Sequence, residues 1–273
     1  MGSAQVQGEL WGAAAERWAE QQERTARPLW TDVLEALGAG LEMRLLDAGC
    51  GAGAGSVDAA AGGCLVTGAD ASAALIEIAR RRLPNSRFDV CDLESLPYAD
   101  ESFDATMAIN AVFYCEDQAA AMRELCRVTR CGGLVAVTAW GPPAECEMRD
   151  IFAATASVMP PPPPGSGGPS LSEPGALENS LSSAGLTARK SGRSQCPFEY
   201  NDVTNAWTAQ SSSGPVQRAI RIAGEEKVRR AFSDAAAAYV QPDGRVVFQN
   251  VFLWSIGERC KGSPKEGNHV GAN

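Results

Sequence analysis

The feature that most constrains this chain is a glycine-rich loop that follows a short apolar run. Leu45 and Leu46 precede an acid, Asp47, and glycines then occupy positions 49, 51 and 53. Glycine lets the backbone turn sharply and approach a ligand closely, because it has no Cβ. The apolar run therefore predicts a buried strand that ends in a ligand-binding turn.

The residues after the loop predict a βαβ unit. Residues 56–61 are typical of the start of a helix, so the loop places free amide N–H groups at a helix N-terminus. A second apolar run at 64–69 then leads to Asp70. A carboxylate at the end of the second strand is placed to accept hydrogen bonds from a ribose diol. The unit predicts a nucleoside-containing cofactor.

Two cofactor classes fit this loop. Gly49 and Gly51 with Ala54, and an acid about 20 residues later, also fit a nicotinamide-dinucleotide fingerprint, which alone is a weak signal. Asp47 favours the other class, because its carboxylate would repel a pyrophosphate but suits a positively charged head such as a methionine ammonium. The chain also lacks an evident Tyr-x-x-x-Lys hydride-transfer motif. A nicotinamide-dependent oxidoreductase stays the alternative.

The pattern Asp-x-Gly-x-Gly-x-Gly at 47–53 resembles motif I of class I S-adenosylmethionine-dependent methyltransferases. The resemblance covers about residues 44–140 and includes the segments 88–93, 96–105 and 123–134. It departs at Cys131, where the family usually has proline, but the following Gly-Gly turn is kept.

The resemblance implies an α/β fold: a Rossmann-like, doubly wound, seven-stranded, mostly parallel sheet with an antiparallel last strand. N-terminal helices and a helical insertion would cap the active site. The expected parts are a helical lid (1–43), a cofactor-binding core (44–144), a cap insertion with the last strands (145–260) and a flexible tail (261–273).

The alternation of patterns along the core agrees with a parallel sheet covered by helices. The apolar runs predict strands at 44–48, 64–69, 86–90, 103–109 and 133–140, and an antiparallel edge strand at 245–256. Helices are expected at 9–24, 28–38, 55–62, 72–83, 118–129, 145–158, 202–212 and 215–238, and another begins near Ser172 and ends at Gly185. The prolines at 160–164 predict a linker or the rim of an acceptor site.

The resemblance also implies site residues. The cofactor, S-adenosylmethionine, and its product, S-adenosylhomocysteine, would lie against Asp47, Gly49, Cys50, Gly51, Gly53, Asp70, Ala71, Asp92, Leu93, Asn110, Ala111 and Trp11. In that family Asp92 would meet the adenine amino group and Leu93 would flank the ring. The candidates for the acceptor pocket are Trp30, Tyr114, Trp140, Met148, Phe152 and Trp207. Trp18 is expected to pack rather than to bind.

The expected function is transfer of a methyl group to an O, N or C atom of a small, partly hydrophobic metabolite, such as a product of secondary metabolism. A methyltransferase-fold protein with a non-methylating role is a further alternative. The single histidine, His269, lies in a polar tail, and the acids at 116–117, Glu145 and Glu147 are expected to cap helices or face solvent. No catalytic residue is assigned.

Composition excludes several classes of partner. The net charge of −9 argues against a nucleic-acid backbone as partner, and the Arg80–Arg82 run is explained as a complement to a helix dipole. The nine cysteines include no Cys-x-x-Cys pair, so we expect no metal site and reduced thiols. No leader pattern or membrane-length apolar stretch occurs, which predicts a cytoplasmic protein. The oligomeric state is not indicated.

Overall fold

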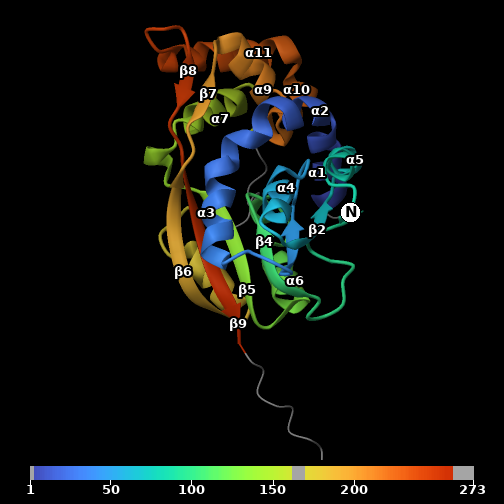
Figure 1. Cartoon of the computed structure of the whole chain (residues 1–273). Coiled ribbons are helices and arrows are strands. Elements are labelled where there is room, and N and C mark those ends of the chain that lie inside the picture. The colour runs from blue at the N-terminus through green and yellow to red at the C-terminus, as the bar shows by residue number, and fades with distance from the viewer. Residues whose placement is uncertain (1–2, 162–169, 261–273) are drawn as a thin grey trace, which may run out of the picture.

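A seven-stranded sheet forms the centre of the molecule in the computed structural model, which describes residues 3–161 and 170–260 (Figure 1). Its order is β3-β2-β1-β4-β5-β9-β6. The neighbours from β3 to β5 pair in parallel, whereas β9 is antiparallel to both β5 and β6. The strands are β1 (Arg44–Ala48), β2 (Leu65–Asp70), β3 (Arg87–Val90), β4 (Phe103–Ala108), β5 (Thr129–Trp140), β6 (Leu186–Gln195) and β9 (Val251–Arg259). The expected fold class is confirmed.

The expectation of one C-terminal edge strand was wrong in two respects. Strand β9 lies inside the sheet, and β6 is the edge. The run expected at 245–256 is also interrupted: β8 (Val246–Phe248) pairs with β7 (Phe198–Tyr200) in a separate two-stranded sheet. Between β8 and β9, the buried Asn250 side chain accepts a hydrogen bond from the Met148 N–H and donates one to the Phe248 carbonyl. These contacts hold the chain where it passes from one sheet to the other.

Helices cover both faces of the main sheet because its strands are apolar on both sides. Leu45 and Leu46 are fully buried and belong to different hydrophobic clusters, as alternate residues of a strand must. Helices α3 (Arg27–Leu37) and α4 (Ala54–Ala61) pack with Leu45, whereas α6 (Gln118–Val128) and α8 (Ala176–Ser183) pack with Leu46. Helix α5 (Ala73–Arg82) packs on β2 and β3 and begins at Ser72, whose hydroxyl accepts the Leu75 N–H.

The N-terminal segment is more broken than the expected helix at 9–24. It consists of α1 (Ser3–Gly12), α2 (Ala15–Arg17), a π-helical turn η1 (Trp18–Gln22) and a 3-10 turn η2 (Glu23–Ala26). Helix α1 lies directly on the loop after β2, where a Cβ at Gly8 would be 2.3 Å from the Ala71 carbonyl oxygen. The segment therefore covers the ends of β1 and β2.

The cap helices gather at the upper end of Figure 1, next to β7 and β8. They are α7 (Met148–Ser157), α9 (Val203–Gln210), α10 (Gly214–Ala223) and α11 (Glu225–Ala236). Short 3-10 turns are η3 (Val112–Tyr114), η4 (Pro143–Glu145) and η5 (Ala237–Tyr239), and η5 contacts α11 and β8. The single helix expected at 215–238 is divided at Gly224, whose φ of +85° favours glycine.

One hydrophobic cluster joins the lid, sheet and cap. It includes Leu29 of α3, Leu45 of β1, Trp207 of α9 and Phe232 of α11. The boundaries expected at 43/44 and 144/145 therefore stay predictions. Most of the polyproline run and the tail at 261–273 lie outside the described residues.

Within residues 3–161 and 170–260, no helix combines the length and apolarity needed to cross a membrane. The cysteines are free, and the same part of the chain holds no group of three or more His, Cys, Asp or Glu side chains suited to a metal ion.

Candidate active site

A large cavity opens where β1, β2 and β4 end, between the sheet, the N-terminal segment and the cap. Its empty volume is about 1400 Å³ with its mouth included.

The glycine loop forms one wall of the cavity. Gly49 and Gly51 both line it and have φ values of +81° and +56°. A Cβ at Gly49 would lie 2.3 Å from the Ala111 Cβ, so glycine lets this loop approach the end of β4. The loop is tied to β2, because the Gly49 and Cys50 N–H groups both donate to the Ala69 carbonyl.

Gly53 was wrongly expected in the cavity wall. Its φ is +81°, and a Cβ there would lie 2.9 Å from the Ala79 Cβ of α5. Gly53 therefore allows α5 to pack against the start of α4, a structural role.

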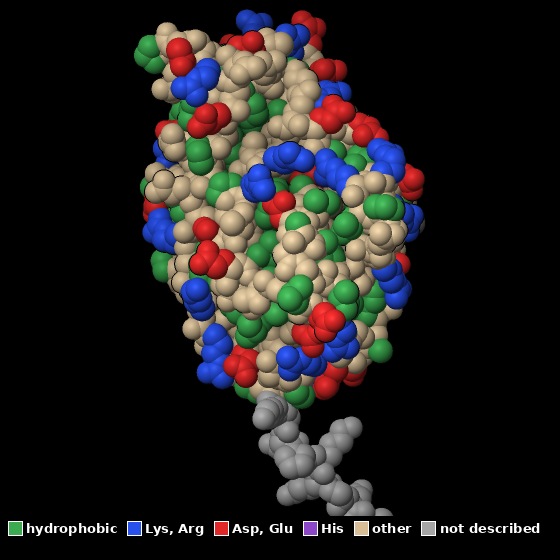
Figure 2. All heavy atoms as spheres, in the orientation of Figure 1, with side chains coloured by type: hydrophobic (Ala, Val, Ile, Leu, Met, Phe, Trp, Pro, Cys, Tyr) green, Lys and Arg blue, Asp and Glu red, His purple; other side chains and the backbone are tan. Residues whose placement is uncertain are grey.

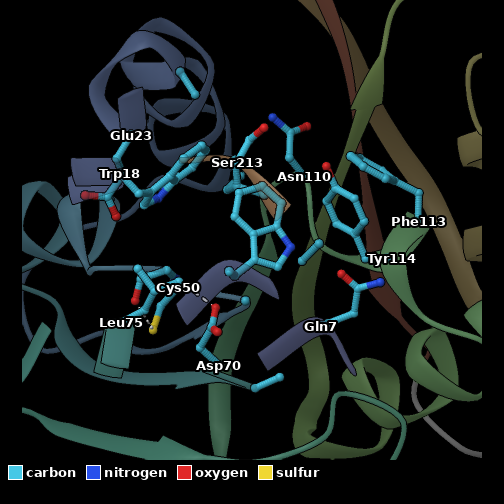
Figure 3. A pocket seen from close by; sticks show the side chains of 18 of the residues that line it. Gln7, Trp18, Glu23, Cys50, Asp70, Leu75, Asn110, Phe113, Tyr114 and Ser213 are labelled. Carbon is cyan, nitrogen blue, oxygen red and sulfur yellow. Dashed lines mark hydrogen bonds between the residues drawn. The ribbon is translucent and has the colours of Figure 1, made fainter. Parts of the chain in front are cut away.

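Asp70 both lines the cavity and holds the glycine loop. Its Oδ2 accepts the Gly51 N–H at 3.0 Å, and its Oδ1 accepts the Ser72 N–H at 2.8 Å (Figure 3). Burial raises the pKa of this carboxyl. Each oxygen has further lone-pair capacity for a ligand hydroxyl.

The remaining candidates for cofactor contact lie in the turns after β2, β3 and β4. Ala71, Asp92 and Leu93 line the cavity, and the Asp92 Oδ1 is oriented by the Glu94 N–H at 2.9 Å. Asn110 has a left-handed φ of +51°, which is uncommon outside glycine. Its N–H donates to the Thr138 Oγ1, which in turn donates to the Asn110 Oδ1 at 3.0 Å, and this pair fixes the turn after β4.

Glu23 is a central site residue that the sequence did not reveal. Its Oε1 accepts the Ala52 N–H at 2.8 Å and the Ala54 N–H at 3.4 Å. These are the amides at the start of α4 that a dinucleotide fold offers to a pyrophosphate. Glu23 occupies them, and its other oxygen pairs with Arg82. No local pattern links Glu23 to a loop 29 residues away, so only the fold could show this contact.

Carboxylates dominate the electrostatics of the cavity wall. Burial raises the pKa of Asp47 to about 7, although the Ser56 hydroxyl at 2.7 Å opposes the shift, and the charges of Glu23 and Asp70 add to it. Burial also raises the pKa of Glu23, against the opposing effect of Arg82. No Lys, Arg or His is among the described residues that line the cavity. The site is built for a cationic or neutral ligand.

The basic side chains instead lie on the outside. Figure 2 shows Lys and Arg side chains in a row across the upper middle of one face. A smaller cleft next to the cavity is lined by Arg24, Arg27 and Arg82 together with Asp58. The sequence suggested only that Arg82 complements a helix dipole. In the structure Arg82 reaches inward from α5 and donates hydrogen bonds to the Ala52 and Ala19 carbonyls, so it also holds the loop and the N-terminal segment.

The other end of the cavity is apolar and aromatic. Of the six expected acceptor residues, Trp30, Tyr114, Trp140 and Phe152 line it. The sequence did not single out further lining residues from β4, β7 and β9, namely Met107, Ile109, Phe198 and Phe252. Their apolar character predicts only burial, so no signal separated them from the core.

Met148 and Trp207 were wrongly expected in this wall. Met148 is fully buried, and its N–H is bonded to Asn250. Trp207 packs on Phe232, with ring centroids 5.5 Å apart, inside the cap. Both side chains point into the core rather than the cavity.

The N-terminal tryptophans differ from the expectation in which of them line the cavity and which pack in the core. Trp11 lines the cavity between Trp18 and Tyr114, with ring centroids at 4.8 and 5.3 Å. Trp18, expected only to pack, also lines the cavity. Trp30 is 5% exposed, and its indole N–H donates to Asp58, so it is largely a packing residue with one edge on the cavity.

The acids beyond β4 and β5 are structural, as expected. Asp117 caps α6 by accepting the Ala120 N–H, Glu145 pairs with Arg193, and Glu147 accepts the Gln249 N–H. Tyr114 lines the cavity, and burial raises the pKa of its phenol, so the group stays protonated at neutral pH. The phenol is a potential hydrogen-bond donor and not a base.

The strand order, the acidic glycine loop and the acid at the end of β2 together define a Rossmann-like fold of the S-adenosylmethionine-binding methyltransferase class. Residues 46–137 match the model of the methyltransferase domain family. This segment of the chain carries the methyltransferase domain of the class I S-adenosylmethionine-dependent type.

Similar proteins agree on the domain but differ in what they act on. A malonyl-[acyl-carrier protein] O-methyltransferase of Erwinia pyrifoliae is 39% identical over 45% of this chain and 47% of its own length. A demethylmenaquinone methyltransferase of Renibacterium salmoninarum is 32% identical over 44% of this chain and 51% of its own. The chain thus spans about half the length of these curated relatives.

The fold also occurs in a protein that is named as a cyclase rather than as a methyltransferase. The crystal structure of the [4+2]-cyclase SpnF superposes with a TM-score of 0.57 at 20% identity, covering 88% of this chain and 84% of that one. This likeness concerns the fold alone.

Proposed function

We propose that this protein transfers the methyl group of S-adenosylmethionine to a small, neutral, partly hydrophobic acceptor. The observation that carries the proposal is the charge of the cavity. Glu23, Asp47 and Asp70 suit a cofactor with a sulfonium and an ammonium, and Glu23 holds the amides that a pyrophosphate would need. This arrangement disfavours the dinucleotide alternative.

The residues at the cofactor end would hold the donor by its two polar parts. Asp70 would accept hydrogen bonds from a ribose diol, and Asp92 and Leu93 would lie at the adenine. Asp47 would face the methionine ammonium, where its ionised form is favoured. S-adenosylmethionine, when bound, supplies an electrophilic methyl group.

The chain itself would contribute to the reaction by orienting donor and acceptor and by excluding water from the site. Methyl transfer is an in-line displacement in which the positive charge on sulfur is dissipated, so strong charges at the methyl group help little. The aromatic wall and the N-terminal cover would hold donor and acceptor in line and exclude water. This explains how the site can act without a positioned base.

The proposed acceptor class rests on the part of the cavity wall that lies outside the residues matched by the family model. Phe198 and Phe252 lie outside residues 46–137. Their apolar surface and the lack of a basic side chain among the described lining residues favour a neutral acceptor over a carboxylate or phosphate ester. The acceptors named for the relatives therefore do not transfer directly to this chain.

The test is calorimetric titration with S-adenosylmethionine, S-adenosylhomocysteine and NADH in parallel. We expect micromolar binding of the first two and none of NADH. Transfer of a labelled methyl group to a panel of neutral phenols, amines and enolisable ketones then tests turnover. Binding of NADH alone would overturn the cofactor assignment, whereas cofactor binding without turnover on any acceptor would favour the non-methylating alternative.

A further inference from the structure

Four polar residues beside the cavity form a single hydrogen-bonded series. It runs from Thr25 through Gln22 and Tyr200 to Gln210, and joins η1, η2, β7 and α9. Gln22 and Gln210 are each 3% exposed, and both line the cavity. Apart from Tyr200, these residues line the same cavity as the apolar acceptor wall.

The direction of every hydrogen bond in this series is set by the first residue, Thr25. The Thr25 hydroxyl donates its one proton to the backbone carbonyl of Gln22 at 2.7 Å, and a carbonyl can only accept. The Thr25 oxygen must therefore accept from the Gln22 Nε2, at 3.1 Å. This orientation turns the Gln22 Oε1 toward Tyr200.

The same logic sets the orientation of Gln210. The Tyr200 hydroxyl donates its proton to the Gln22 Oε1 at 2.6 Å, so it can only accept from Gln210. The Gln210 Nε2 makes that bond at 2.9 Å. The Oε1 of Gln210 is then the free end of the hydrogen-bonded series, because the bond between Gln210 and Tyr200 is made by the Nε2.

The Ser213 hydroxyl is a second hydrogen-bond acceptor on this wall. The Ser213 hydroxyl lines the cavity and donates its proton to the Gln210 carbonyl at 2.8 Å, which leaves only its lone pairs for a ligand. In Figure 3, Ser213 lies between Trp18 and Asn110. Two neighbouring groups, on α9 and the turn after it, thus both offer acceptors.

We propose that Gln210, with Ser213 beside it, is a specificity-determining residue that selects acceptors carrying a hydroxyl or N–H group. The substrate class is a neutral, largely apolar molecule with at least one hydrogen-bond donor, held by the Gln210 Oε1. This proposal rests on the proposed methyl transfer for its meaning, but its binding step does not depend on turnover.

The test compares two probes that differ in one proton donor, 2-naphthol and 2-methoxynaphthalene. Binding is measured by calorimetry, with and without saturating S-adenosylhomocysteine. We expect wild-type protein to prefer 2-naphthol by about tenfold, the scale of one buried hydrogen bond. Gln210→Met keeps the length of the side chain but lacks its polar atoms, and it should bring the preference close to one.

Two variants separate recognition from folding. Tyr200→Phe removes the contact that orients the Gln210 amide, so the amide can turn and the preference should also fall while both probes still bind. Gln217→Met is the matched control, because the Gln217 Nε2 donates to the Ser211 carbonyl and the side chain does not line the cavity. It should keep the wild-type preference.

An equal preference in wild type and Gln210→Met would overturn the proposal, as would a wild-type protein that binds neither probe or favours the ether. Failure of S-adenosylhomocysteine to bind would instead refute the proposed function. The measurement on the free protein would still decide the role of Gln210 in that case.

Discussion

Asp70 shows how a single carboxylate serves both the loop and the ligand. It accepts N–H groups from Gly51, in the loop it supports, and from Ser72, after its own strand. A substitution there changes the shape of the site as well as its contacts with a ribose.

We predict that Asp70→Asn weakens binding of S-adenosylhomocysteine by about 1.5–3 kcal/mol, the scale of hydrogen bonds to a charged group. Asparagine keeps one oxygen for the backbone amides, so the loop is disturbed less than by alanine. Calorimetry gives the change. Asp234→Asn, at an exposed position on α11, is the control. An unchanged affinity in Asp70→Asn would place the ribose elsewhere.

Gly51 is the loop residue at which a side chain would meet Glu23 beside the cavity. Its φ is +56°, and a Cβ would lie 3.2 Å from the Glu23 Oε1 and face the cavity. We predict that Gly51→Val abolishes cofactor binding. Gly40→Val tests whether valine as such is harmful, because a Cβ at Gly40 would meet only the Gly38 carbonyl oxygen at 3.8 Å, an ordinary contact, and Gly40 has no positive φ. Normal binding by Gly51→Val would refute the assignment of the loop.

Among the elements, the N-terminal segment, the loop before α4 and helix α5 are coupled through one ion pair. Arg82 on α5 pairs with Glu23 and also donates to the Ala52 and Ala19 carbonyls. Only 7% of the Glu23 side chain and 24% of Arg82 are exposed. Loss of the arginine would leave a buried carboxylate unpaired.

Arg82→Met should therefore lower the free energy of unfolding by about 3–5 kcal/mol. Its neighbour provides the contrast: Arg81 pairs with Glu16, and their side chains are 53% and 65% exposed. Arg81→Met should cost at most about 1 kcal/mol, as exposed pairs do. Urea denaturation measures both, and equal losses would show that the buried pair does not couple these elements.

The cap helices are held by their own packing as well as by the sheet. Trp207 of α9 lies on Phe232 of α11, which is fully buried. Trp207→Ala should cost about 3–5 kcal/mol of stability, as large-to-small changes in a core do. The folded protein should keep its affinity for S-adenosylhomocysteine and for 2-naphthol. A selective loss of 2-naphthol binding at full stability would restore Trp207 to the acceptor wall.

At the scale of the whole molecule, the acidic cavity links stability and ligand binding to pH. Burial raises the pKa of Asp47 from its ordinary value of 3.8 to about 7, and it also raises the pKa of Glu23 and Asp70. An acid with a raised folded pKa stabilises the fold where it is protonated, so its contribution is lost as the pH rises from about 4 toward 7. A cationic ligand reverses this penalty.

We predict that the stabilisation of the protein by S-adenosylhomocysteine, measured as a rise in Tm, is larger at pH 8 than at pH 6. Asp47 must ionise to meet the ligand ammonium, and ionisation is more complete at the higher pH. Asp47→Asn should raise the Tm of the free protein at pH 8 and reduce the pH dependence of the ligand effect. A ligand effect that is larger at pH 6 in wild-type protein would contradict this account.

Sequence patterns indicated the site where its residues are close along the chain. The loop at 47–51 and Asp70 belong to one βαβ unit, whose geometry is set by local rules, and the structure places these residues on one cavity. Sequence patterns could not predict whether an apolar residue lines the cavity or packs in the hydrophobic core. Met148 and Phe152 lie on the same helix, yet only Phe152 reaches the cavity.

The sequence by itself determined the parallel part of the sheet, the glycine loop and the cofactor class, because strand and helix periodicities and glycine turns are local properties of the chain. Only the tertiary structure decided which distant groups complete the site: Glu23 on the loop amides, the Gln22–Tyr200–Gln210 series and the aromatic wall. These contacts depend on how the cap and the N-terminal segment pack over the sheet. The bond from Tyr200 to Gln22, for example, joins residues 178 positions apart that no local pattern relates.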